Sequence, residues 1–167
     1  MILVGGGSRS GKSSAALQML NKAGPRRGFI ATAQAWDEEM RDRIARHREE
    51  RDAAIVTFEE PLAVADLLEA EDGRYDAILV DCLTLWLSNM MLAGGKDVEG
   101  ECRKLVATAA RVQTKVILVT NEVGCGIVPE NALARQFRDA AGKLNQMAGE
   151  NAVEVHWMIF GVGLRIK

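Results

Sequence analysis

The sequence lacks an excess of charge of either sign, and it lacks a long hydrophobic run. Its 167 residues include 21 Lys and Arg against 23 Asp and Glu, for a formal net charge of −2. Such a balance does not favour nucleic acid as a partner. No apolar stretch approaches the ~20 residues that a membrane-spanning helix needs. The short apolar run at residues 1–4 has no basic leader before it, unlike a secretory signal peptide. We therefore expect neither a nucleic-acid partner nor a membrane span.

Cysteine is also scarce. Cys82, Cys102 and Cys125 are too far apart for a CxxC metal or redox motif, and their odd number argues against a disulfide framework. A reducing cytoplasm is therefore the expected location. The apolar fraction of 48% and the charged fraction of 26% are typical of a soluble globular protein. The length suits a single domain that spans residues 1–167.

The N-terminal segment contains the most informative motif. Residues 6–13, GGSRSGKS, match the phosphate-loop (P-loop) pattern G-x-x-x-x-G-K-[ST]. The apolar run before them predicts a strand and the residues after them predict a helix, which is the context that this motif requires. Backbone N–H groups would surround phosphate oxygens, Lys12 would reach the β- and γ-phosphates, and Ser13 would ligate Mg²⁺. The alternative is a glycine turn that binds nothing. The expected phosphate-contacting residues are Gly6, Gly7, Ser8, Arg9, Ser10, Gly11, Lys12 and Ser13.

Strand and helix patterns alternate along the rest of the chain. Mostly continuous apolar runs predict strands at residues 1–5, 28–32, 55–58, 77–81, 116–120 and 153–160. Apolar residues at helical spacing predict helices over residues 98–112 and 133–147, and Pro61 is expected in the first turn of another. This alternation predicts an α/β fold with a doubly wound, mostly parallel sheet flanked by helices.

Two predicted strands end in polar residues. Asp81 closes one of them and would hold Mg²⁺ beside a P-loop, although it could instead cap the following helix. Asn121 and Glu122 close the other, where a regulatory GTPase would have its guanine-reading N-K-x-D sequence, so that class is disfavoured. The glycine-rich residues 124–131 then either face the ligand crevice or form a plain connector in which Asn131 caps the next helix.

A strongly charged helix is predicted over residues 37–51. Most of its side chains suit a solvated surface with ion pairs four residues apart. Met40, Ile44, His47 and Arg51 nevertheless fall on one stripe, at spacings of four, three and four. A histidine on an inward stripe is either a hydrogen-bonded packing residue or a catalytic group, and the pattern alone leaves both open.

Five blocks of the sequence together resemble one enzyme family, the bifunctional adenosylcobinamide kinase / adenosylcobinamide-phosphate guanylyltransferases of cobalamin biosynthesis. The blocks are GGSRSGKS at 6–13, FIATAQAWDEEMRDRIARHREER at 29–51, TFEEP at 57–61, VDCLTLWLSNM at 80–90 and TNEVGCGIVPENALARQFRDAAGKLNQ at 120–146. Ile55 stands where the family usually has tryptophan, and Val162 where a proline is common. Neither is a catalytic position, so the implied activity is unchanged.

The resemblance implies a two-step enzyme with a RecA-like P-loop NTPase fold. The first step would phosphorylate the aminopropanol hydroxyl of adenosylcobinamide with ATP or GTP. The second would transfer GMP from GTP to that phosphate through a covalent histidine–GMP intermediate and release pyrophosphate. The histidine in the matching context is His47. The family also implies Mg²⁺ as cofactor, a corrinoid and a nucleoside triphosphate as binding partners, and a homotrimer.

The same matching implies further nucleotide-binding positions. They are Ala31, Thr32 and Ala33 after the second strand; Arg48, Glu49, Glu50 and Arg51 after the histidine; and Glu59 and Asp81. Arg48 and Arg51 would neutralise the triphosphate. Glu59 could accept hydrogen bonds from the guanine edge, an inference from chemistry alone.

The sequence leaves three questions open. The broadly apolar residues 83–92 suit a helix covered by a partner or a corrinoid, but equally an ordinary core helix. The chain could be a P-loop small-molecule kinase in which His47 is structural. It could also be a nucleotide sensor without catalytic activity.

Overall fold

A computed structural model describes residues 1–167 except 36, 50 and 96, and within helix α2 it leaves the side chains at 43, 46, 47 and 49 outside the description. The strands are β1 Ile2–Gly6, β2 Arg27–Ala31, β3 Ile55–Glu59, β4 Ala77–Asp81, β5 Lys115–Asn121, β6 Glu154–Ile159 and β7 Val162–Arg165. The helices are α1 Lys12–Lys22, α2 Glu38–Glu49, α3 Val64–Ala70, α4 Leu83–Ala93, α5 Val98–Arg111 and α6 Ala132–Asn151.

The strands form one seven-stranded sheet in the order β3-β2-β4-β5-β1-β6-β7. All neighbouring pairs are parallel except β6 and β7, which form an antiparallel hairpin. β5 therefore lies between β1, which leads into the P-loop, and β4, which ends at Asp81. The predicted α/β fold with a mostly parallel, helix-flanked sheet is confirmed.

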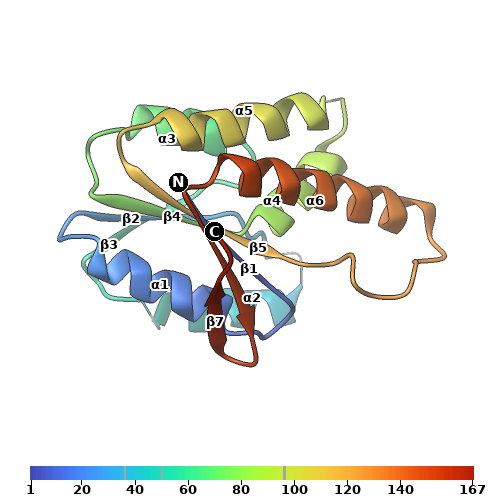
Figure 1. The fold of residues 1–167 in the computed structure, drawn as a ribbon, viewed down its shortest axis with the longest axis horizontal. Coiled ribbons are helices and arrows are strands. Elements are labelled where there is room, and N and C mark those ends of the chain that lie inside the picture. The colour runs from blue at the N-terminus through green and yellow to red at the C-terminus, as the bar shows by residue number, and fades with distance from the viewer. Residues whose placement is uncertain (36, 50, 96) are drawn as a thin grey trace.

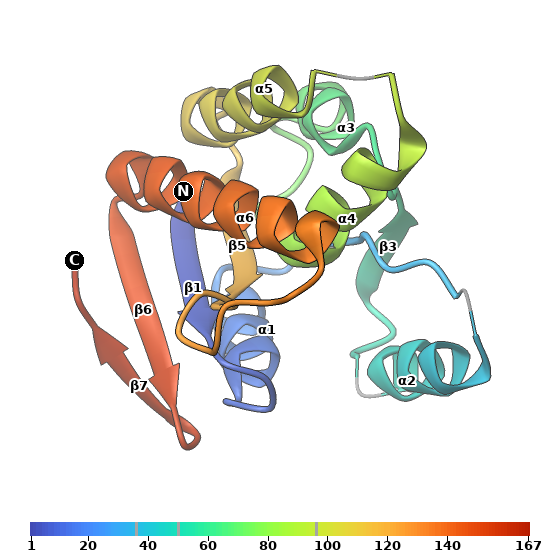
Figure 2. The ribbon, with the colours of Figure 1, turned by 90° about the vertical axis from the view of Figure 1, so that its right-hand side faces the viewer.

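Helices cover both faces of the sheet, which explains why the central strands are continuously apolar (Figures 1 and 2). Successive strand residues face opposite sides. Leu3 packs in the cluster on the side of α3, α4, α5 and α6, and Val4 packs in the cluster on the side of α1. α2 stands apart from the four-helix layer (Figure 2).

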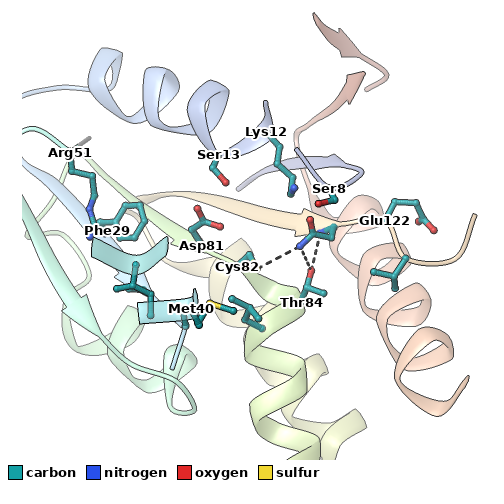
Figure 3. A pocket seen from close by; sticks show the side chains of 16 residues that line it. Ser8, Lys12, Ser13, Phe29, Met40, Arg51, Asp81, Cys82, Thr84 and Glu122 are labelled. Atoms are coloured by element: carbon teal, nitrogen blue, oxygen red, sulfur yellow. Dashed lines mark hydrogen bonds between the residues drawn. The ribbon is translucent and has the colours of Figure 1, made fainter. Parts of the chain in front are cut away.

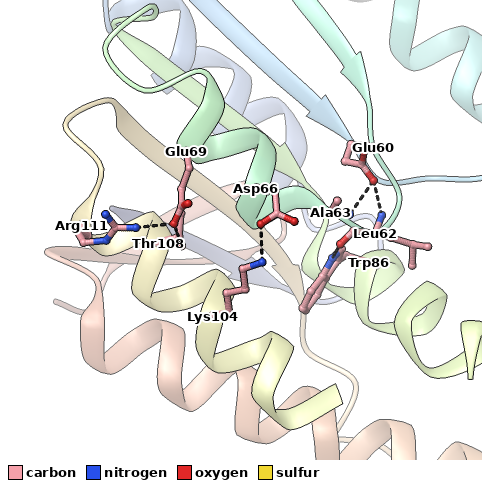
Figure 4. Close-up of polar contacts among 9 residues, drawn as sticks. All are labelled: Glu60, Leu62, Ala63, Asp66, Glu69, Trp86, Lys104, Thr108 and Arg111. Carbon is pink, nitrogen blue, oxygen red and sulfur yellow. Dashed lines mark hydrogen bonds and ion pairs between the residues drawn. The ribbon is translucent and has the colours of Figure 1, made fainter. Parts of the chain in front are cut away.

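Helix α3 begins later than the sequence suggests. Pro61 was expected in its first turn, but α3 starts at Val64. The reason is visible in Figure 4: the Glu60 carboxylate accepts hydrogen bonds from the backbone N–H groups of Leu62 and Ala63, which holds these residues in a turn before the helix. In the same region the Trp86 indole N–H donates to the Leu62 carbonyl at 2.9 Å, so α4 is tied to this turn.

The C-terminal hairpin was not predicted. Residues 153–160 were expected to form one strand, but the chain reverses at Phe160 and Gly161 and returns as β7. Both residues have positive φ, 51° and 81°, as in a tight two-residue hairpin turn. Phenylalanine is unusual at such a position, so the sequence contained no ordinary turn signal there.

The helical stripes are only partly buried. In α5, Cys102, Leu105 and Ala109 lie in the core as predicted. In α6, Leu144 is buried, but Leu133 at the start of the predicted stripe is 51% exposed. Helix α4 buries Leu83, Trp86, Leu87, Asn89 and Met90, which favours the interpretation of this segment as a core helix.

Candidate nucleotide-binding site

The P-loop connects β1 to α1 at the carboxyl edge of the sheet, and two of its glycines are required by close contacts. A Cβ added at Gly6 would lie 2.5 Å from Ser10 Oγ and 2.7 Å from the Met158 carbonyl oxygen. Gly11 has a left-handed φ of 90° and directly precedes α1, and a Cβ there would lie 3.3 Å from Gly161 Cα. A larger residue at either position would push the loop out of shape.

The start of α1 has the features of an anion site. No acidic residue lies in its first turn, and its N-cap, Gly11, supplies no capping side chain. The first backbone N–H groups and the positive end of the helix dipole are thus available to an anion. Lys12 is buried, with its Nζ donating to the Gly7 carbonyl at 3.1 Å. Ser10 Oγ is also buried and has no hydrogen-bond partner among the described residues, as expected of a loop built to contact phosphate.

A cavity of about 290 Å³ opens beside this loop (Figure 3). Five separate segments line it: the P-loop, the end of β2, α2 with the residues that follow it, the β4–α4 connection and the end of β5. The lining residues are Ser8, Lys12, Ser13, Phe29, Ala31, Ala33, Met40, Ile44, Arg51, Asp81, Cys82, Thr84, Leu85, Asn121, Glu122 and Val123. Several predicted site residues therefore line the same cavity.

Ser13 and Asp81 face the same cavity from α1 and β4 (Figure 3). One hydroxyl and one carboxylate are a small ligand set, which suits Mg²⁺, an ion that usually keeps several waters and shares its remaining positions with substrate phosphates. No group of three or more His, Cys, Asp or Glu side chains suited to a metal occurs among the described residues. The donor set thus fits a nucleotide-associated magnesium ion rather than a protein-enclosed metal. Cys82, not Asp81, is the N-cap of α4, so the alternative role of Asp81 as helix cap is wrong.

Arg51 and Phe29 form a contact that the sequence did not reveal. The Arg51 guanidinium carbon lies 4.2 Å from the centroid of the Phe29 ring, a cation–π geometry. Burial and the nearby Arg48 lower the pKa of Arg51, whereas Asp81 raises it. Phe29 lies on β2 two residues before Ala31, so both face the cavity. Only this alternation along β2 could have identified Phe29 beforehand.

Other predicted residues lie beside the cavity rather than in it. Glu59 forms an exposed ion pair with Arg48, and both line a neighbouring hollow that also includes Arg51. Thr32 is fully buried, and its Oγ1 both donates to the Cys82 carbonyl and accepts from the Cys82 N–H, each at 2.8 Å. Thr32 therefore ties the ends of β2 and β4 together, while Ala31 and Ala33 on either side line the cavity.

Three predicted residues of the charged segment fall outside what the structure describes. The backbone of His47 and Glu49 belongs to α2, but their side chains are not described, and neither is Glu50. The structure does place Met40, Ile44 and Arg51, the other members of the stripe, along the cavity.

The end of β5 contributes polar groups to the site, among them Glu122, which the sequence offers with Asp81 as a candidate general base for the substrate hydroxyl. Asn121 and Glu122 line the cavity, as does Thr84 from the first turn of α4. Beyond them, residues 124–130 form an irregular, mostly exposed segment. The Asn131 side chain accepts from the Ala134 N–H at 3.0 Å, so its predicted role as cap of α6 is confirmed.

Comparison with known proteins identifies the family. The family model described as "Cobinamide kinase / cobinamide phosphate guanyltransferase" matches residues 2–166. The chain belongs to this family. It is 42% identical to the bifunctional adenosylcobalamin biosynthesis protein CobU of Salmonella typhimurium, with 100% of this chain and 99% of that protein covered. It is 44% identical to the bifunctional adenosylcobalamin biosynthesis protein CobP of Pseudomonas aeruginosa, with 99% and 96% covered.

Solved structures with little sequence similarity share the fold. The RadB recombinase superposes with a TM-score of 0.55 at 14% identity, covering 93% of this chain and 72% of that one. The VirB11 ATPase of the Brucella suis type IV secretion system superposes with a TM-score of 0.50 at 15% identity, covering 99% and 48%. These likenesses place the domain among P-loop NTPase folds. Among the residues described, none of the helices combines the length and the apolar character needed to cross a membrane.

Proposed function

We propose that this chain phosphorylates adenosylcobinamide with ATP or GTP and then transfers GMP from GTP to the resulting phosphate, yielding adenosylcobinamide-GDP and pyrophosphate. Membership of the kinase/guanyltransferase family over residues 2–166 supports both activities. The observation that carries the proposal is the convergence of Lys12, Ser13, Asp81 and Arg51, from three separate segments, on one cavity beside a P-loop.

In the kinase step, the residues of the P-loop hold the triphosphate. The loop N–H groups and Ser10 Oγ contact the phosphate oxygens, and Lys12 leaves the Gly7 carbonyl to neutralise charge on the β- and γ-phosphates. Ser13 and Asp81 would hold Mg²⁺, which when bound offsets negative charge on the transferred phosphoryl group. Ala31, Ala33 and Leu85 provide an apolar wall that limits access of water.

In the transfer step, His47 is the nucleophile. Imidazole ordinarily titrates near pH ~6.5, so most of it is neutral and nucleophilic at pH 7. Its attack on the α-phosphorus forms a phosphoramidate and releases pyrophosphate, and the substrate phosphate then takes the GMP, which restores the histidine. The helical repeat supports this role, because position 47 shares a face of α2 with Met40 and Ile44, which line the cavity.

GTP labelled on its α-phosphate tests the covalent step. Wild-type protein should take up an acid-labile, base-stable label, and the label should be absent from His47→Ala. His47→Ala should retain the kinase step, since phosphoryl transfer to a hydroxyl needs no protein nucleophile. A wild-type protein that makes adenosylcobinamide phosphate but never takes up label would favour a kinase without the transferase step. Loss of both steps in His47→Ala would indicate a structural histidine.

We further propose a homotrimer in the cytoplasm. The hairpin carries the exposed apolar side chains of Phe160, Val162 and Leu164, which contact with other copies would cover. Light scattering should then give a mass near three times that of the 18.2 kDa chain. A mass equal to that of one chain at working concentration would contradict the trimer.

A further inference from the structure

The Asn121 side chain lines the cavity from the end of β5. This strand lies between the strand of the P-loop and the strand of Asp81. Asn121 is paired in register with Gly6, and the adjoining Glu122 N–H donates to the Gly6 carbonyl at 3.1 Å. Asn121 thus lies in the cavity between the phosphate-binding loop and the carboxylate assigned to magnesium.

Hydrogen bonds fix the orientation of the Asn121 amide. Its Nδ2 donates to Thr84 Oγ1 at 3.1 Å and lies 3.9 Å from Cys82 Sγ, while its backbone N–H donates to the same Thr84 oxygen at 2.8 Å. Thr84 belongs to the first turn of α4, so this anchor is itself held by a helix. Because the NH₂ group of the amide is directed at α4, the side-chain oxygen Oδ1 is directed away from α4. Among the described residues, no donor is within hydrogen-bond distance of Oδ1.

A neutral acceptor at this place has a specific chemical use. The kinase step requires a hydroxyl to be held in line with the γ-phosphorus, and a hydroxyl is held best through its proton. An amide oxygen accepts that proton in a hydrogen bond without adding negative charge beside the triphosphate. The carboxylate of the adjoining Glu122 is instead engaged by the Gly124 N–H.

We propose that Asn121 Oδ1 is a catalytic group that orients the attacking hydroxyl of the corrinoid substrate, and that Thr84 is its positioning residue. The hydroxyl oxygen forms a bond to the γ-phosphorus as the bond from that phosphorus to the β,γ-bridging oxygen breaks. ADP or GDP leaves, and the hydroxyl proton ends in solvent. This proposal rests on the proposed function, because it assigns a group to the first of the two steps.

The two activities of the enzyme supply the test. The kinase step is measured with adenosylcobinamide and ATP, and the transfer step with adenosylcobinamide phosphate and GTP. Asn121→Leu, which keeps the size of the side chain but removes the amide, should lower kcat of the kinase step by about 100-fold, the loss typical of a misplaced reactant. The KM for ATP and the rate of GMP transfer should stay at wild-type values, because neither depends on orienting the hydroxyl.

Thr84 provides a second, independent variant pair. Thr84→Val removes the acceptor that holds the Asn121 amide and should lower kcat of the kinase step selectively, by about 10-fold. Thr84→Ser keeps the hydroxyl and should restore the rate. Asn145→Ala is the matched control. Asn145 Nδ2 donates to the backbone carbonyl of Asn121 at 3.3 Å, but Asn145 does not line the cavity, so its loss should leave the ratio of the two rates unchanged.

Each outcome decides between the possibilities. The proposal is supported if Asn121→Leu loses the kinase step selectively and if Thr84→Ser keeps the kinase rate that Thr84→Val loses. An equal loss of both steps, or no loss, overturns it and leaves Asn121 a structural residue. If Asn121→Leu does not fold, the Thr84 pair alone decides. A wild-type protein inactive in both assays would instead refute the proposed function.

Discussion

Individual side chains place positive charge at two ends of the nucleotide cavity. Lys12 enters from the start of α1, and Arg51 enters from the segment after α2, where the Phe29 ring supports its guanidinium (Figure 3). Lys12 is buried and Arg51 is half-buried, and this reduced contact with water strengthens their interaction with a polyanion. A triphosphate between them would meet charge at both ends.

Lys12→Ala should remove this charge without harming the fold. We expect the rates of both steps to fall by at least about 100-fold, the usual cost of losing a group that stabilises developing charge. Lys22→Ala, at the exposed C-terminal end of the same helix, is the control and should keep wild-type rates and nucleotide affinity. Product formation and binding of a fluorescent nucleotide check both variants. Normal product formation by Lys12→Ala would contradict the P-loop assignment.

The three cysteines should differ in reactivity. Cys82 and Cys102 are buried, and burial raises the pKa of each thiol to about 11, with nearby acidic side chains adding to the effect. Only the thiolate reacts with alkylating agents, so both residues should resist modification at pH 8. Cys125 is exposed and should be modified alone. Mass spectrometry should find one label on the folded protein and three after denaturation; rapid labelling of Cys82 in the folded protein would refute this expectation.

At the scale of elements, residues that share one helical pattern differ in how deeply they are buried. Helix α5 packs against α3 and α6, and its inner side is fully covered. Side chains on its outer side join α3 through ion pairs, Lys104 with Asp66 and Arg111 with Glu69 (Figure 4). These exposed pairs contribute little compared with the apolar contacts beneath them.

A matched pair of leucines tests this difference. Leu105 in α5 is 0% exposed and Leu133 in α6 is 51% exposed. Leu105→Ala should lower the free energy of unfolding by about 2–5 kcal/mol, because it removes buried methyl groups and leaves a cavity. Leu133→Ala should change it by less than about 0.5 kcal/mol. Urea denaturation measures both, and equal losses would contradict the burial assigned to either helix.

At the scale of the whole molecule, two carboxylates hold the loops at the amino edge of the sheet. Asp76 accepts from the backbone N–H and the guanidinium of Arg26, which joins the start of β2 to the loop before β4. Asp72 accepts from the N–H groups of Gln113 and Thr114, which joins the end of α3 to the loop before β5. Both ties connect segments about forty to fifty positions apart in the chain.

These ties predict how stability depends on pH. Hydrogen bonds to backbone N–H groups lower the pKa of Asp72 and of Asp76 below the ordinary 3.8. As the pH falls just below 3.8, the unfolded chain therefore binds more protons than the folded one, and stability is lost. The urea midpoint should stay level from pH 7 to 5 and fall by pH 3. The urea midpoint of Asp72→Asn should fall less steeply over the same range. A wild-type midpoint that does not change at pH 3 would contradict the lowered pKa values.

The sequence by itself determined the fold class, the P-loop, the positions of most strands along the chain and the family. These depend on local patterns: glycines at fixed spacing before a helix, apolar runs of strand length, and motifs read along the chain. Even so, the predicted start of α3 was wrong and the turn at Phe160 was missed. The hydrogen bonds to Glu60 and a positive φ at a bulky residue are both set by neighbours in space.

Only the tertiary structure decided which residues share the cavity. Phe29, Thr84 and Asn121 lie on segments far apart in sequence, and each looks ordinary within its own strand or helix. Thr32 and Glu59 matched the family pattern, yet the first is buried as a tie between strands and the second pairs with Arg48 outside the cavity. The carboxyl ends of parallel strands meet at one edge of the sheet, and the strand order fixes which ends are adjacent. That order is created by packing of distant segments, so no local pattern contains it.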